Sequence, residues 1–111
     1  MRAARWFILL LLFCVACGSL RKIPYRVKQG YRFELQMGDV GEIHVIGSWN
    51  GWQRGVHTMH NWGSYYWLDI DLAPGRYEYA FLSDSGRIMP ENIGETIDDG
   101  FGGVNALAVV E

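Results

Sequence analysis

Two tryptophans that flank a turn are the residues best placed to do chemistry. Trp49 and Trp52 lie in the run GSWNGW, residues 47–52, with an Asn-Gly pair between the two rings. Asn-Gly favours tight turns, and the alternating run EIHVI at residues 42–46 predicts a strand directly before it. We therefore expect Trp52 on a loop beside a sheet edge. There its ring is either a platform for a flat ligand or a partly buried packing residue.

A stacking platform of this kind suits sugars, whose rings have weakly apolar C–H faces and polar rims. Trp62 lies in the glycine-rich stretch that follows, and we expect its ring to be exposed. Trp67 alternates with apolar positions of the next predicted strand, so we expect it to cover the outer side of a sheet.

The other polar clusters do not form a recognisable metal or catalytic site. His57 and His60 have no cysteine nearby and no identifiable third ligand, so no zinc site is predicted. The carboxylates of residues 91–99 lack the alternating oxygen ligands of a calcium loop. No nucleophile with a base motif and no glycine-rich phosphate loop occurs. The sequence predicts no enzyme, cofactor or metal, and its net charge of −2 argues against nucleic acid.

Two-residue alternation predicts the elements that must position these side chains. Ala73-Pro74-Gly75 reverses the chain between two alternating segments, which predicts a hairpin. Six or seven short strands without a helical period predict an all-β, immunoglobulin-like antiparallel β-sandwich. The expected strands are residues 31–37, 43–45, 66–72, 77–81, 88–89 and 104–110, with long loops at 47–63 and 91–103.

Residues 1–17 have the composition of an export signal peptide. Arg2 and Arg5 precede an apolar run, residues 6–16, that is too short to span a bilayer as a helix. Cys17 follows Ala16 and precedes Gly-Ser, as in a bacterial lipobox, although Cys14 stands where leucine is usual. We expect lipidation of Cys17 and a membrane-anchored lipoprotein of the bacterial cell envelope. The alternative is cleavage near the same site, which gives a secreted or periplasmic protein.

Residues 18–29 are predicted to be a linker, because they contain Pro24 and no apolar period. Residues 30–111 then form one domain, large enough for one hydrophobic core. Basic residues gather in residues 21–32, near the start of the mature chain, and most acidic residues lie later. We expect this basic stem to be solvated, with contact to anionic lipid as the alternative.

Three spaced motifs identify a family. They are GSWNGW at 47–52, PGRYEYAF at 74–81 and DDGFGGVN at 98–105. With these motifs the chain resembles, over about residues 31–110, the glycogen-binding, early-set domains of carbohydrate-binding module family 48. Such domains occur in the beta subunit of AMP-activated kinase and at the N-termini of isoamylases and branching enzymes. The resemblance implies an early-set sandwich in which Trp49 packs at a strand end and Trp52 and Asn105 contact an α-glucan.

Two positions depart from the family's site. The family's lysine is Ala80 here, and its second tryptophan falls near Gly86 or Arg87. One hypothesis is a non-catalytic module that binds an α-glucan polysaccharide or oligosaccharide at a rebuilt site, with Trp62, Tyr65 and Arg87 as further candidates. The other is a structural or protein-interaction domain of the cell envelope that binds no sugar.

Overall fold

The computed structural model describes residues 21–111. The predicted signal peptide and the predicted lipidation site, Cys17, lie outside these residues. Within residues 21–111, no helix is both long enough and apolar enough to cross a bilayer.

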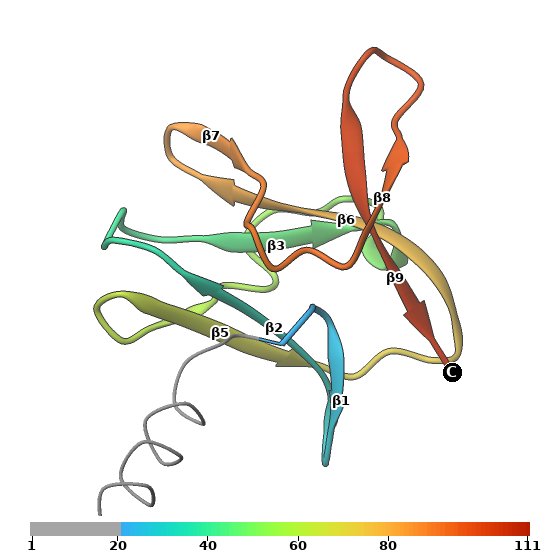
Figure 1. Cartoon of the computed structure of the whole chain (residues 1–111), viewed down its shortest axis with the longest axis horizontal. Coiled ribbons are helices and arrows are strands. Elements are labelled where there is room, and N and C mark those ends of the chain that lie inside the picture. Colours follow the sequence, from blue (N-terminus) through green and yellow to red (C-terminus); the bar gives the residue numbers. More distant parts are fainter. Residues whose placement is uncertain (1–20) are drawn as a thin grey trace, which may run out of the picture.

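Nine strands in the described residues form two antiparallel sheets that pack face to face (Figure 1). The first sheet has the order β1-β2-β5-β4, with bounds Tyr25–Val27, Gly30–Gln36, Tyr65–Ile70 and His60–Asn61. The second sheet has the order β3-β6-β9-β8, with bounds His44–Gly47, Gly75–Ser83, Val104–Val110 and Glu95–Asp98. Strand β7, Gly86–Ile88, also pairs with β6. When β7 and β8 are left out and the other strands are lettered in chain order, the sheets correspond to the A-B-E-D and C-F-G strands of an immunoglobulin domain. The predicted all-β sandwich is confirmed.

The core lies between the sheets and is built from alternate residues of their central strands. Phe33 and Leu35 of β2 face Tyr79 and Phe81 of β6, and none of the four side chains is more than 1% exposed. The ring of Phe33 meets Tyr79 edge-on, with centroids 4.9 Å apart. Burying one such side chain stabilises the fold by about 1.5–3 kcal/mol. Because one residue in two points inward, the intervening residues of each sheet form an outer face.

The predicted hairpin between residues 66–72 and 77–81 is wrong. Strand β5 pairs with β2, and β6 pairs with β3 and β9, so the chain crosses from one sheet to the other between Ile70 and Gly75. A turn with Pro-Gly reverses the chain equally well within a sheet and between sheets. Alternation gives both strands an apolar side, but it does not show whether these sides lie next to each other or across the core.

Two segments predicted to be irregular contain strands. The loop at 91–103 includes β8, which is exposed at all four positions and pairs with β9. The predicted linker at 18–29 includes β1, which pairs with β2, and Ile23, which is 2% exposed and bridges to Ile93. Both are short edge strands that are held in place by pairing with a neighbouring strand. Neither needs an apolar period of its own, and neither has one.

Candidate functional site

A concavity of about 490 Å³ lies on the outer face of the second sheet. Tyr79, Phe81 and Ala106 are core residues, so their neighbours Glu78, Leu82 and Asn105 point outward. The lining residues come from β3, β6, β7 and β9 and from the loops beside them; they are Ile46, Ser48, Trp52, Arg54, Glu78, Leu82, Arg87, Asp99, Phe101 and Asn105. The structure therefore brings Trp52 and Asn105 together.

A larger cavity, of about 650 Å³, lies between Leu35 and Met37 on one side and residues 88–92 on the other. None of its lining residues is aromatic. Flat ligands are held by rings together with a few polar groups. We therefore take the concavity at Trp52 as the candidate site.

Trp52 holds an unusual backbone conformation. Its φ is 63°, in the left-handed region, and it follows Gly51 at φ 68°. A side chain in this region costs about 1 kcal/mol. The Trp52 N–H donates to the carbonyl of Gly47 at 2.9 Å and closes the turn around the 3-10 helix Ser48–Asn50. This turn places the half-buried indole at the concavity.

Trp49 packs on the core, as predicted. Its ring lies 6.1 Å from Phe33 and 6.0 Å from Tyr77, measured between centroids. A Cβ at position 47 would overlap the Trp49 ring, so Gly47 is required for space. The indole Nε1 donates to His57 Nε2 at 3.1 Å, and burial lowers the pKa of His57. These contacts fix the start and end of the loop that carries Trp52.

Asn105 organises the polar side of the concavity. It is 7% exposed, and its Nδ2 donates to Glu78 Oε1 at 3.0 Å. Its Oδ1 accepts from Arg87 Nη2. The Glu78 N–H donates to Ser48 Oγ at 3.1 Å and ties this chain of polar groups to the Trp52 turn. Asn105 thus holds a carboxylate and a guanidinium beside the indole, and these groups can hydrogen-bond hydroxyls on a ligand.

Phe101 is a site residue that the sequence analysis missed. It lines the concavity from the β8–β9 turn and is 95% exposed. Asp99 Oδ1 accepts from the N–H groups of Phe101 and Gly103, at 2.7 and 3.0 Å, and these bonds lower the pKa of Asp99. The sequence signal for Phe101 is a single aromatic residue among glycines and aspartates. It predicts an exposed ring, since nothing in such a turn can bury it.

The remaining predicted residues fall in three places. Trp62 and Tyr65 lie on the first sheet, apart from the concavity. Arg87, one of the two positions near which the family's second tryptophan is expected, lines the concavity. Ala80 is 5% exposed and pairs with Ile46, and alternation along β6 places it on the same outer face between Glu78 and Leu82.

Both loop histidines have structural partners, and so do Asp98 and Asp99 among the acidic residues. His60 stacks on Trp67 with 4.4 Å between ring centroids. Asp98 Oδ1 accepts from the Gly100 N–H at 2.8 Å, within the β8–β9 turn. Over residues 21–111, no three His, Cys, Asp or Glu side chains are grouped so that they could hold a metal ion.

The fold is a β-sandwich with a concavity on the outer face of one sheet, which is the architecture of a binding module. Residues 32–111 match the family described as the glycogen recognition site of AMP-activated protein kinase. Because this match spans most of the chain, the protein belongs to that family, whose members are carbohydrate-binding modules. The comparison with curated proteins finds no match.

Proposed function

We propose that this protein is a non-catalytic module that binds α-glucan chains in the concavity lined by Trp52 and Asn105. One observation carries the proposal: two residues far apart in the sequence, both expected at a glucan site, line one open concavity on the outer face of the second sheet. Membership of a glycogen-recognition family supports the ligand class.

The site residues divide into rings and polar groups. The Trp52 indole stacks on the C–H face of a glucose unit, and the exposed Phe101 ring contacts the chain from the β8–β9 turn. Glu78 and Arg87, held by Asn105, hydrogen-bond the hydroxyl rim. The guanidinium of Arg87 supplies donors that the family obtains from its lysine, which Ala80 replaces.

Trp52→Ala tests this site. Removal of a central stacking ring should cost about 2 kcal/mol or more, a rise in Kd of roughly thirtyfold. Tryptophan fluorescence is titrated with glycogen, soluble starch and maltoheptaose, and with a β-glucan as the control ligand. Trp52→Phe keeps a ring and should retain part of the affinity. Unchanged binding by Trp52→Ala, at an unchanged thermal midpoint, would remove Trp52 from the site.

A protein-interaction domain of the cell envelope is the second candidate. Two observations favour it: both ends of the Asn105 amide are already hydrogen-bonded inside the protein, and Ala80 offers no donor. This candidate predicts no response to any glucan in the same titration, together with a specific envelope protein crosslinked to the wild type.

We further propose that the protein is exported and anchored to a membrane through a lipid on Cys17. The proposal is based on the apolar run at 6–16 and on the small residues around Cys17. Cells fed labelled palmitate should incorporate the label into the wild-type protein and not into Cys17→Ala. An unlabelled wild type would leave plain secretion.

A further inference from the structure

The outer face of the first sheet carries a second group of aromatic side chains, which neither the core nor the candidate site uses. We call it the β5 face and define it by Arg32, His60, Trp62, Tyr65 and Trp67. Register pairs His60 with Trp67, and the Trp62 N–H donates to the Tyr65 carbonyl at 2.8 Å. These side chains therefore lie on one side of the sheet, opposite Tyr66, which is buried in the core.

The rings of the β5 face hold one another in place. The Arg32 Cζ lies 4.8 Å from the centroid of the Trp67 ring. The centroid of the His60 ring lies 4.4 Å from that of Trp67. Trp62 meets Trp67 at 75°, with centroids 5.7 Å apart, and lies 6.4 Å from Tyr65. Trp62 is nevertheless 69% exposed. A large ring is thus oriented by two others while much of its surface stays open, so binding orders little and loses little entropy.

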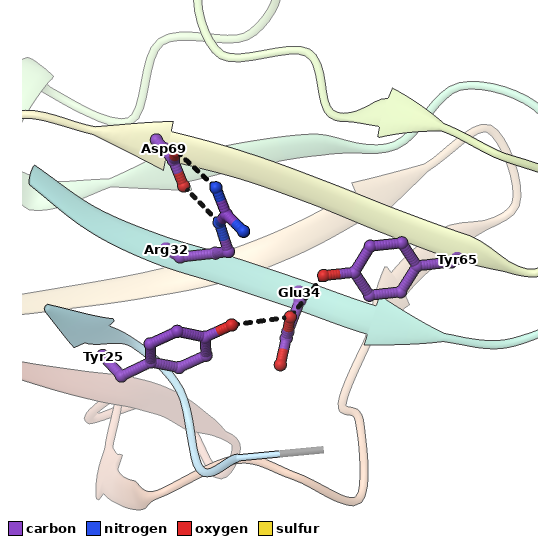
Figure 2. Close-up of polar contacts among 5 residues, drawn as sticks. All are labelled: Tyr25, Arg32, Glu34, Tyr65 and Asp69. Atoms are coloured by element: carbon purple, nitrogen blue, oxygen red, sulfur yellow. Dashed lines mark hydrogen bonds and ion pairs between the residues drawn. The ribbon is translucent and has the colours of Figure 1, made fainter. Parts of the chain in front are cut away.

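Two polar contacts lie beside Tyr65 and Arg32 of this face, and Figure 2 shows both. Glu34 Oε2 accepts from the hydroxyls of Tyr25, at 2.9 Å, and Tyr65. Arg32 forms a bidentate pair with Asp69, at 2.7 and 2.9 Å. Burial and the bond to Glu34 raise the pKa of Tyr65.

We propose that the β5 face is a second carbohydrate-binding surface, with Trp62 as its stacking platform, so that one module engages a polysaccharide at two places. The proposal takes its ligand class from the proposed function. A flat protein partner would have to desolvate the Arg32–Asp69 pair, which is costly. A sugar chain can lie along the rings, use polar groups at their rim and leave the surroundings hydrated.

The two surfaces cannot share one short ligand. They are the outer faces of two stacked sheets, whose backbones are about 10 Å apart with the core between them. A maltooligosaccharide should therefore occupy each surface separately. A polymer with many chain ends can engage both, and linked binding of this kind raises apparent affinity by about 10²–10⁴.

The test uses the purified protein in four forms: wild type, Trp62→Ala, Trp52→Ala and the double variant. Calorimetry with maltoheptaose counts sites per chain, and light scattering follows the cross-linking of glycogen particles. We expect two sites and strong scattering for the wild type, one site and little scattering for each single variant, and no binding for the double variant. Trp62→Phe should keep the second site. Light scattering without glycogen verifies that the protein is a monomer.

The outcomes separate this inference from the proposed function. If Trp62→Ala matches the wild type in stoichiometry and scattering, the second surface is overturned, and the β5 face is left to a protein partner. If Trp52→Ala binds like the wild type while Trp62→Ala loses all binding, the first site is wrong and the second stands. A wild-type protein that binds no glucan overturns both.

Discussion

Two buried tyrosines differ in whether the side-chain hydroxyl has a hydrogen-bond partner. Tyr66 and Tyr79 are both 0% exposed. The Tyr66 hydroxyl donates to the Gly41 carbonyl at 2.8 Å and accepts from the Val40 N–H at 3.0 Å. The Tyr79 hydroxyl has no hydrogen-bond partner among residues 21–111, and its burial raises its pKa. Since a buried hydroxyl is favourable only when it is paired, the same substitution should act in opposite directions at the two positions.

Tyr79→Phe should therefore raise the free energy of unfolding by about 1 kcal/mol, because it removes an unpaired polar group and keeps the ring contacts with Phe33 and Phe81. Tyr66→Phe should lower the free energy of unfolding by about 1–3 kcal/mol, because the hydrogen-bond partners of the Tyr66 hydroxyl are left unpaired. Urea denaturation measures both values. Equal destabilisation by the two variants would contradict the assignment of an unpaired hydroxyl to Tyr79.

Sequence reasoning reached part of the candidate site at the residue scale. Trp52 could be predicted because the turn that exposes it is formed by the Asn-Gly pair directly before it. Asn105 could be predicted because it belongs to a family motif. The position of Arg87 depends on its register opposite Leu82, and the Asn105 bonds depend on β6 and β9 being neighbours. Such relations between strands are set by tertiary pairing, which local patterns do not contain.

At the element scale, β1 and Ile23, which lies shortly before it, belong to the sandwich. Ile23 is buried against the core, and Tyr25 bonds to Glu34, which is only 3% exposed. The sequence pattern favoured a linker here, because one buried apolar residue beside Pro24 and several basic residues does not produce an apolar period. The family match begins at residue 32 and leaves β1 out.

Ile23→Ala should lower the free energy of unfolding by about 2–4 kcal/mol, since it leaves a cavity at a position that is 2% exposed. Lys22→Ala, at the adjacent exposed position, is the matched control and should change it by less than about 0.5 kcal/mol. Chemical denaturation compares the two variants with the wild type. Neutral behaviour of both would contradict the packing of Ile23 in the core.

At the scale of the whole molecule, the two sheets have outer faces of different chemistry. The second sheet presents a concavity with a carboxylate and a guanidinium, whereas the first presents rings packed edge to face beside an ion pair. The sandwich itself could be predicted from alternation and turns. The division of strands between sheets could not, because β5 and β6 carry the same kind of pattern although they lie on opposite sides of the core (Figure 1).

The position of β1 has a mechanical consequence. The described chain enters the sandwich through β1, an edge strand of the first sheet with three residue pairs, while Trp52 and Asn105 lie on the second sheet. Tension between residue 21 and a polymer held at Trp52 would load the bridge between Ile23 and Ile93 first and then the three residue pairs between β1 and β2. Release of residues 21–29 would add about 30 Å of slack. If the polymer is held more tightly than these residues, the module would lengthen under a sudden pull before it released the polymer.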